Sequence, residues 1–334
     1  MRHETKKIAF MSSAPIALPV LDALFEQAVG KVVIAGIFTQ PDRPHGRGRH
    51  LKPNAIKRWS IERKVPVLQP EPFHEAALEW VQANRIDVLL VMAYGHILRP
   101  ALLESVPLGA VNLHASLLPA FRGASPIASA LAAGATVTGV TLMQMTAEMD
   151  AGPIADSERC IIPNDADAET LGAALAQAAV PLVQRNLSKL LTGELEFKPQ
   201  DEAHATYTRK LTKSDGRIDF NKPAIAIERR IRALHPWPGC FLNFQEKTIK
   251  IGRAEANETA HDAKPGQVLA HSADALVVAV GTGTLRLKSL QRPGGRLLPA
   301  ADFLRGLPIP IGSVLEGGPM NPLLVNRTAE ALPH

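Results

Sequence analysis

The chain has 334 residues, of which 46% are hydrophobic and 21% are charged, and its formal net charge is +5. This composition excludes a disordered or fibrous chain, and the length favours two domains. The two cysteines, Cys160 and Cys240, lie far apart without zinc-ligand spacing, which excludes a disulfide scaffold and indicates no metal site.

The first residues superficially imitate a secretion signal, because Lys6 and Lys7 precede an apolar run. We interpret residues 8–10 instead as a first strand, 12–15 as a turn and 18–28 as an amphipathic helix. No run is long and apolar enough to cross a membrane. We therefore expect a cytoplasmic enzyme.

Short apolar runs then alternate with helical segments. The predicted strands are residues 31–38, 87–92, 109–116 and 137–143, and the predicted helices are 54–63 and 75–84. This alternation predicts an α/β fold with a Rossmann-like, mostly parallel sheet. Ligands of such sheets bind beyond the carboxyl ends of the strands. Tyr94 and the strand that carries Asn112 and His114 are expected to meet there.

An alanine-rich helix is predicted between residues 169 and 191, where we end a catalytic domain that spans 1–191. The polar segment 192–213 is interpreted as a linker. A smaller domain, 214–318, starts with a helix at 225–233 and continues with five predicted strands, at 240–244, 248–251, 266–270, 275–280 and 284–290. Such spacing suits a small all-β domain. Residues 319–334 are predicted to form a tail.

The pair Asn112 and His114 carries the strongest chemical signal. Side chains alternate along a strand, so Asn112, His114 and Ser116 should share one face, while Val111 and Leu113 turn to the core. Acyl transfer needs an oxyanion donor, a proton acceptor and a group that orients the imidazole. Asn112, His114 and the downstream Asp150 can fill these roles. No serine or cysteine has a nucleophile signature, which favours direct transfer between two bound substrates.

An Asn-x-His pair by itself is more often a structural strand end, but further motifs follow in order. They are Ser116-Leu-Leu-Pro119, Arg122-Gly123 and Asp150-Ala-Gly152. At these residues the chain resembles the folate-dependent formyltransferases. Within them it is most similar to the branch that formylates methionyl-tRNA, because three further signatures occur at residues 38–48, 209–219 and 235–239.

The resemblance implies transfer of the formyl group of 10-formyltetrahydrofolate to the α-amino group of methionine on initiator tRNA, by a monomer that needs no metal. It also implies that the second domain is an OB-like β-barrel. The implied catalytic residues are Asn112, His114 and Asp150. The implied folate contacts are Ser116, Leu117, Leu118, Pro119 and Tyr94.

Two basic segments are implied to contact tRNA, although charge runs are commonly just solvated surface. The first is a glycine- and proline-rich loop with Arg43, Arg47, Arg49 and Lys52, and the second is the linker with Arg209, Lys210 and Lys213. Cations of the second domain would form a further basic face if they converge; they are Arg229, Arg230, Arg232, Lys247, Lys250, Arg253, Arg286 and Lys288.

Two details concern local structure. Ser12-Ser13 stands where the family commonly has Gly-Thr, which puts any substrate contact of this turn in doubt. The segment His235-Pro-Trp-Pro-Gly239 is interpreted as a rigid corner that packs Trp237 against the barrel.

Two other functions remain open. The same centre could formylate a small amine, such as a nucleotide precursor or an amino sugar, although the long carboxyl domain and the basic loop argue against it. The chain could also be an RNA-binding protein with an inactive formyltransferase-like domain, against which the complete set of Asn112, His114 and Asp150 argues.

Overall fold

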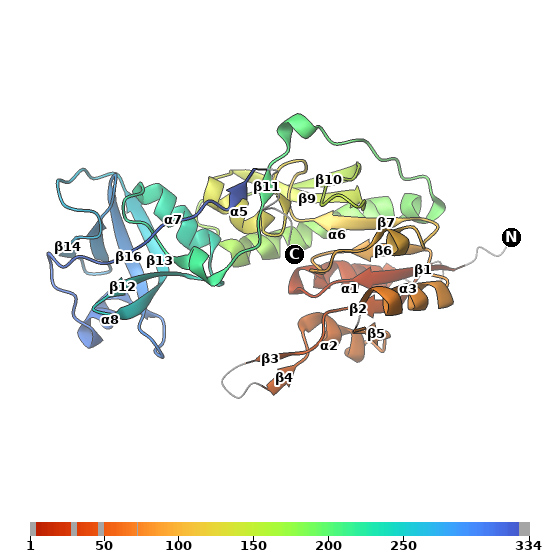
Figure 1. Ribbon diagram of the computed structural model, residues 1–334, viewed down its shortest axis with the longest axis horizontal. Coiled ribbons are helices and arrows are strands. Elements are labelled where there is room, and N and C mark those ends of the chain that lie inside the picture. Colours follow the sequence, from red (N-terminus) through yellow and green to blue (C-terminus); the bar gives the residue numbers. More distant parts are fainter. Residues whose placement is uncertain (1–4, 28–31, 46–49, 72, 327–334) are drawn as a thin grey trace. The chain divides into compact units, whose positions relative to one another are not determined.

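The computed structural model describes residues 5–27, 32–45, 50–71 and 73–326, which form two compact units (Figure 1). The first unit comprises Met1–Gly123, Val137–Ile161 and Gly172–Tyr207. The second comprises Ala124–Thr136, Ile162–Leu171 and Thr208–His334. The chain therefore passes between the units several times.

The first unit is built on a seven-stranded sheet with the order β10-β9-β7-β6-β1-β2-β5. Its strands are β1 (Lys6–Met11), β2 (Val32–Phe38), β5 (Val67–Leu68), β6 (Val88–Val91), β7 (Ala110–His114), β9 (Val137–Gln144) and β10 (Ile154–Ile161). Strands β5, β2, β1, β6 and β7 run parallel to one another. Strand β9 pairs in the antiparallel direction with β7 on one side and with β10 on the other. The predicted mostly parallel sheet is confirmed.

Strand β10 was absent from the prediction. It lies at the edge of the sheet and carries Asp156, Glu158 and Arg159 among its apolar residues. Only part of such a strand is covered, so it lacks the continuous apolar run by which the central strands are recognised.

The longer helices of the first unit agree with the predicted segments. They are α1 (Leu18–Gln27), α2 (Ala55–Glu62), α3 (Phe73–Ala83) and most of α6 (Ala168–Thr192). The shorter η1 (Pro15–Ala17), α4 (Pro100–Leu103) and η2 (Glu202–His204) were not predicted. Helix α2 begins after Asn54, whose side chain accepts a hydrogen bond from the Lys57 amide at 2.9 Å. This N-cap satisfies a backbone donor that the first turn would leave unpaired.

Connections at the carboxyl ends of the parallel strands carry the polar motifs. Short strands occur there: β3 (Arg43–His45) pairs with β4 (His50–Lys52) as a hairpin, and β8 (Arg122–Gly123) lies beside β11 (Tyr207–Thr208). The chain order of the strands reverses between β1 and β6. Crevices at such a reversal are the usual ligand sites of open α/β sheets.

The second unit contains an antiparallel sheet with the order β12-β13-β16-β15-β14 and β17 paired to β16. Its strands are β12 (Cys240–Phe244), β13 (Lys247–Asn257), β14 (Val268–His271), β15 (Leu276–Ala279), β16 (Thr284–Gln291), β17 (Leu298–Pro299) and, apart from this sheet, β18 (Leu324–Val325). Its helices are α5 (Pro126–Ala133), η3 (Lys213–Gly216), α7 (Ala224–Ala233) and α8 (Ala300–Gly306). All five strands predicted here are confirmed.

One segment joins the two edges of this sheet. Glu316 bridges to Asn243 in β12, and Val314 bridges to Gln267 just before β14. The sheet is therefore closed around its core, as an OB-like barrel requires. The core includes Ile249, Leu287 and also Leu323, which belongs to the segment predicted as a tail.

Candidate active site

His114 ends the central strand β7 and is only 6% exposed. Asn112 lies two residues earlier and is half-buried, so both side chains project from the same face of the strand. Val111 and Leu113, which alternate with them, are 1% and 2% exposed. The predicted alternation is therefore present: Val111 and Leu113 lie in the core, and Asn112 and His114 lie on the opposite face of the strand.

The carboxylate of Asp150 faces one nitrogen of the imidazole. The distance from His114 Nδ1 to Asp150 Oδ2 is 3.5 Å, and Asp150 is 17% exposed. The same Oδ2 accepts a hydrogen bond from the Gly123 amide at 2.8 Å. Asp150 has a φ of +50°, a left-handed conformation that aspartate adopts more readily than most residues. The backbone of this turn therefore aims the carboxylate at the ring.

The other ring nitrogen also faces an oxygen. His114 Nε2 lies 3.0 Å from the carbonyl oxygen of Phe121, a residue with a φ of +61°. A carbonyl and a carboxylate are both acceptors, so a proton on either nitrogen finds a partner. Two oxygens consequently fix the plane of the imidazole. The structure brings together all three predicted catalytic residues.

The turn Ser116-Leu-Leu-Pro119 is held by its own polar groups. Ser116 is fully buried, and its hydroxyl donates to the carbonyl of Ala120 at 2.6 Å. Thr141 on β9 donates its hydroxyl to the Ser116 carbonyl at 2.7 Å, and the Leu118 amide donates to Thr141 Oγ1 at 3.1 Å. These bonds give the turn a fixed shape beside His114.

Tyr94 follows β6 and is 3% exposed. Its ring centroid lies 5.4 Å from that of Phe73 and 5.1 Å from that of His96, and burial raises the pKa of its hydroxyl. The nearby Ser13 hydroxyl donates to the Tyr94 carbonyl at 3.1 Å and accepts from the Gln40 amide at 3.0 Å. Ser13 thus ties together the segments that follow β1, β2 and β6.

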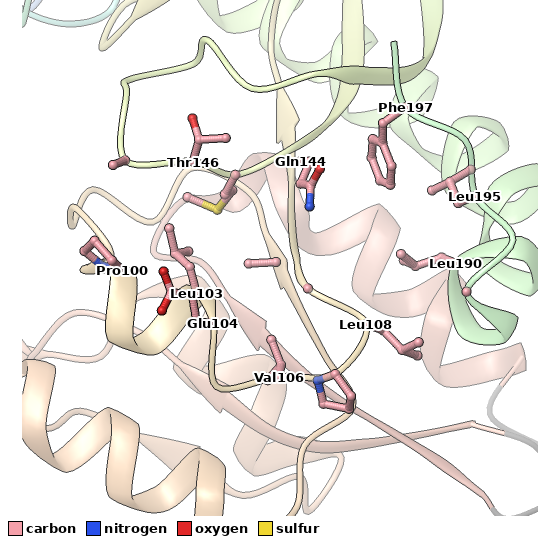
Figure 2. Close-up of a pocket in the computed structure, with 16 residues that line it drawn as sticks. Pro100, Leu103, Glu104, Val106, Leu108, Gln144, Thr146, Leu190, Leu195 and Phe197 are labelled. Carbon is pink, nitrogen blue, oxygen red and sulfur yellow. The ribbon is translucent and has the colours of Figure 1, made fainter. Parts of the chain in front are cut away.

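A cavity of about 670 Å³ opens in the same unit, of a size that holds a drug-sized ligand (Figure 2). Figure 2 shows Pro100 and Leu103 on one side of the cavity and Leu195 and Phe197 on the opposite side. Its lining also includes Ala110 of β7, which shares a face with Asn112 and His114. Thr146 and Ala147 line it as well, a few residues before Asp150.

None of the five predicted folate contacts lines this cavity, which is built from three stretches, 100–110, 144–147 and 190–197. Sequence reasoning did not single out these residues because they are mostly apolar and carry no motif. They are brought together by the pairing of β7 with β9 and by the end of α6.

Comparison with known proteins identifies the family. Residues 6–187 match the family described as formyl transferase, and residues 210–308 match the formyl transferase C-terminal domain. The chain belongs to the formyl transferase family.

Relatives cover nearly the whole chain. It is 39% identical over 313 residues to the methionyl-tRNA formyltransferase of Hahella chejuensis, a match that covers 93% of this chain and 98% of the relative. The Chloroflexus aggregans protein of the same name is 40% identical over 306 residues, with 91% and 98% covered. A solved N-formyltransferase of Helicobacter canadensis, in complex with folinic acid and dTDP-3-aminofucose, shares the fold with a TM-score of 0.63 at 15% identity, and 85% of this chain and 99% of that chain are covered.

The basic loop of this formyl transferase is described in part. Arg43 is exposed and donates to the Gln40 side chain at 2.8 Å, and Lys52 is also exposed. Arg47 and Arg49 lie outside the described residues. The two described cations stand on the two paired strands of the hairpin, where Arg43 is opposite Lys52.

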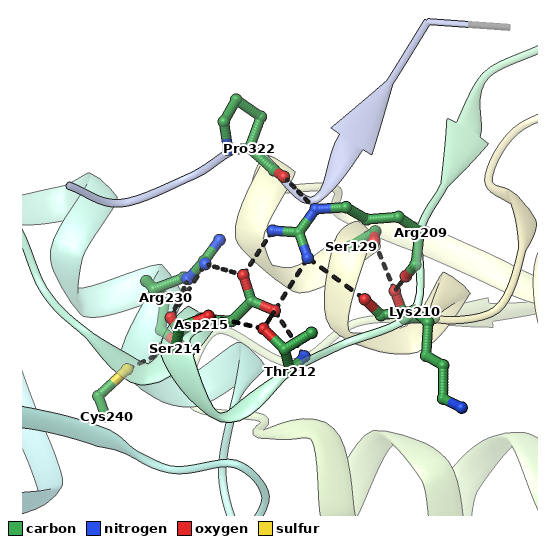
Figure 3. A network of polar contacts seen from close by, with 10 residues as sticks. Ser129, Arg209, Lys210, Thr212, Ser214, Asp215, Arg230, Cys240 and Pro322 are labelled. Atoms are coloured by element: carbon green, nitrogen blue, oxygen red, sulfur yellow. Dashed lines mark hydrogen bonds and ion pairs between the residues drawn. The ribbon is translucent and has the colours of Figure 1, made fainter. Parts of the chain in front are cut away.

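The three cations of the predicted linker differ in their surroundings, and Figure 3 shows two of them, Arg209 and Lys210. Lys210 and Lys213 are exposed. Arg209 Nη1 donates to Asp215 Oδ2 at 2.9 Å, and its Nε donates to the Pro322 carbonyl at 3.0 Å. For Arg209 this pairing favours a structural role.

Asp215 is the centre of that network. Burial would raise its pKa, but hydrogen bonds from Arg209 and Thr212 outweigh burial and lower the pKa to about 2. Arg230, only 3% exposed, donates to the Asp215 carbonyl at 3.0 Å, and burial lowers the pKa of this arginine. Asp215 therefore stays ionised and holds two arginines within the second unit.

The remaining cations of the second unit do not form a uniform basic face. Arg232 pairs with Glu228, while Arg286 and Lys288 pair with Asp274 and Glu255. Lys247, Lys250 and Arg253 are exposed on β13. The predicted packing of Trp237 against the barrel is wrong, because this side chain is 55% exposed. The rigid His-Pro-Trp-Pro segment holds the indole outward.

The described residues contain neither a metal-ligand cluster nor a membrane-spanning helix. Among residues 5–27, 32–45, 50–71 and 73–326, no group of three or more His, Cys, Asp or Glu side chains could hold a metal ion. In the same part of the chain, no helix has the length and apolar character needed to cross a membrane.

Proposed function

We propose that the protein transfers the formyl group of 10-formyltetrahydrofolate to the α-amino group of methionine on initiator tRNA. The observation that carries the chemistry is the juxtaposition of His114 with Asp150 at 3.5 Å, on the face of β7 that also presents Asn112. Methionyl-tRNA as the acceptor is favoured by the relatives, which are named methionyl-tRNA formyltransferase and which match this chain over almost their full length.

The reaction requires a neutral amine. A free α-amino group has a pKa of about 8, so most of the amine is protonated at neutral pH. A base must therefore accept a proton from the ammonium group before the amine can attack. His114 takes this proton, and Asp150 orients the ring and balances the charge of the imidazolium. The amine lone pair attacks the formyl carbon and forms the new C–N bond. Asn112 donates a hydrogen bond to the oxyanion of the tetrahedral intermediate.

Collapse of that intermediate breaks the bond between the formyl carbon and the folate nitrogen. The electron pair of the broken bond stays on that nitrogen, which receives the proton that the attacking nitrogen releases, and tetrahydrofolate leaves. No covalent enzyme intermediate is needed, in keeping with the missing serine or cysteine nucleophile signature. Both ring nitrogens of His114 have an oxygen partner, so the ring keeps its orientation as it gains and loses the proton.

For the folate, we propose that its ring system occupies the cavity beside Ala110, Thr146 and Ala147. Ala110 and Asn112 are two residues apart on one strand face, a separation of about 7 Å. A ligand that fills the cavity can therefore extend a reacting atom toward Asn112 and His114. The turn Ser116–Pro119 and Tyr94 remain proposed contacts for the part of the folate outside the cavity.

For the tRNA, we propose that phosphates contact cations on three parts of the chain. They are the hairpin with Arg43 and Lys52, the loop residues Arg47 and Arg49, and the linker residues Lys210 and Lys213. Arginine and lysine on exposed loops are suited to phosphate contacts, which fix register without reading sequence. We further propose a cytoplasmic monomer in which 1–191 carries the proposed catalytic residues, 214–318 contacts tRNA and the segment 192–213 connects these two parts of the chain.

One experiment separates the candidate functions. The protein is incubated with labelled 10-formyltetrahydrofolate and either initiator Met-tRNA or a panel of free amino sugars and nucleotide precursors. Label on Met-tRNA is the expected result. Label only on a small amine would instead support the second function. Tight tRNA binding without any formyl transfer would support an RNA-binding protein with an inactive domain.

A further inference from the structure

A buried polar network lies directly behind Asp150. Its centre is Arg122, which is 0% exposed and is the largest fully buried side chain among the described residues. Arg122 donates from Nε at 3.0 Å and from Nη2 at 2.7 Å to Gln200 Oε1. It also pairs with Glu202 at 2.7 Å and donates to the Tyr207 hydroxyl at 3.0 Å. The arginine thus fixes the amide orientation of Gln200.

Gln200 in turn holds the backbone that presents Asp150. With Oε1 turned to Arg122, its Nε2 donates to the carbonyl of Asp150 at 2.8 Å and to the carbonyl of Gly152 at 2.7 Å. Asp150 is in the left-handed conformation, which is costly for a residue other than glycine unless its surroundings impose it. Both N–H donors of the Gln200 side-chain amide therefore bind the backbone of this turn.

Thr206 holds the other neighbour of the imidazole. Its Oγ1 accepts a hydrogen bond from the Phe121 amide at 2.8 Å, and its carbonyl accepts from the Arg122 amide at 2.8 Å. Phe121 supplies the carbonyl that lies 3.0 Å from His114 Nε2, and its φ is also positive. The short segment that carries Gln200 and Thr206 therefore holds the two residues, Asp150 and Phe121, whose oxygens face the ring nitrogens of His114.

This segment lies outside both family matches, which end at residue 187 and resume at residue 210. It is anchored to the sheet by Lys198, which exchanges two backbone hydrogen bonds of 2.8 Å with Ile154 at the start of β10. Its residues up to Tyr207 belong to the first unit. By sequence alone it is part of a polar linker.

We propose that residues 198–207 are a structural part of the catalytic centre, in which Gln200 and Thr206 are positioning residues for Asp150 and Phe121. This inference rests on the proposed function, because it assigns Asp150 the role of orienting His114. Neither residue touches substrate in this assignment. Their effect on the rate passes through the two oxygens that flank the imidazole.

The test is a double-mutant cycle between Gln200 and Asp150. Gln200→Leu keeps the approximate volume but removes both donors, and Gln82→Leu, at an exposed position of α3, is the matched control. Because an ångström-scale misplacement can cost about a hundredfold, we expect Gln200→Leu to lower the single-turnover rate at least tenfold. The KM for Met-tRNA and the Kd for folate should change less than about twofold.

The cycle distinguishes positioning from general destabilisation. In the Asp150→Asn background, Gln200→Leu should change the rate by less than about threefold, because the group it positions is already lost. The same fold-loss in both backgrounds, or an unchanged rate in Gln200→Leu, would overturn the proposal. If Gln200→Leu fails to fold, variants of Thr206 provide the test. Thr206→Ser keeps the hydroxyl and should retain the wild-type single-turnover rate, whereas Thr206→Val should lower this rate at least fivefold. Equal rates for these two variants would overturn the proposal as well.

A spectroscopic readout keeps this inference separate from the proposed function. In protein labelled with 15N-histidine, the His114 ring signals, assigned with His114→Ala, should shift in Gln200→Leu and in Thr206→Val but not in Gln82→Leu. If wild-type protein fails to formylate Met-tRNA, the proposed acceptor is refuted, and the His114 ring signals still test the positioning role of Gln200 and Thr206. Unshifted ring signals would overturn the positioning role even in an active enzyme.

Discussion

Replacing Asp215 with asparagine should destabilise the second unit by about 2 kcal/mol at neutral pH. The side chain of Asp215 is 2% exposed, and its hydrogen bonds with Arg209 and Thr212 lower its pKa from 3.8 to about 2. Each unit of pKa difference between the folded and unfolded states corresponds to about 1.4 kcal/mol. Asparagine keeps the shape and one acceptor, but it leaves Arg209 and Arg230 without a counter-charge.

The lowered pKa of Asp215 also predicts how the stability difference between wild type and Asp215→Asn changes with pH. A carboxyl group whose pKa is lowered by folding stabilises the protein fully above its unfolded pKa, and this contribution is lost as the pH falls through the folded pKa. For Asp215 the window lies between about pH 4 and pH 2. The stability difference between wild type and Asp215→Asn should therefore be constant from pH 7 to pH 5 and fall to about half near pH 3.

The assay is urea unfolding at several pH values, followed by hydrogen-exchange mass spectrometry of peptides from α7 and β12, which belong to the same unit as Asp215. Asp262→Asn, at an exposed position of this unit, is the control and should change stability by less than about 0.5 kcal/mol. A wild-type level of stability for Asp215→Asn at pH 7 would refute the reasoning. So would a stability difference that stays constant down to pH 3.

Three further predictions concern the proposed reaction. His114→Ala should lower the single-turnover formylation rate by about a hundredfold or more while folate binding, followed by calorimetry, stays nearly intact; a rate close to wild type would remove His114 from the mechanism. Thr146→Trp should fill part of the cavity and weaken folate binding by at least tenfold with little effect on tRNA binding, and unchanged folate affinity would place the folate elsewhere. Replacing Lys210 and Lys213 together with alanine should weaken tRNA binding and reduce its salt dependence by about one unit of slope per charge, without lowering Tm; an unchanged slope would show that both are simply solvated.

The proposed catalytic residues could be singled out from the sequence because their signal is local. Asn112 and His114 are two positions apart on one strand, and the period of a strand puts them on one face whatever surrounds it. Asp150 was added by its motif. The neighbours that fix the imidazole were not predictable in this way, because the Phe121 carbonyl is a backbone group that every residue type possesses.

The roles of the cations depended equally on their surroundings. Sequence puts Arg209, Lys210 and Lys213 in one basic segment, yet Arg209 pairs with a buried carboxylate and the two lysines are exposed. Likewise, the proline-flanked Trp237 reads as a packed corner but is largely exposed. The sign of a charge or the apolar character of a ring does not tell which side chain meets a partner.

By itself the sequence determined the alternation of strands and helices, the strands of the second unit and the face of β7 that carries Asn112 and His114, because these follow from short-range periodicity. Only the tertiary structure decided how the polar segment 198–207 is used. Gln200 lies 50 residues from Asp150, and Thr206 lies 85 residues from Phe121. Hydrogen bonds across such separations depend on how the chain returns to the sheet, and no local pattern records that path.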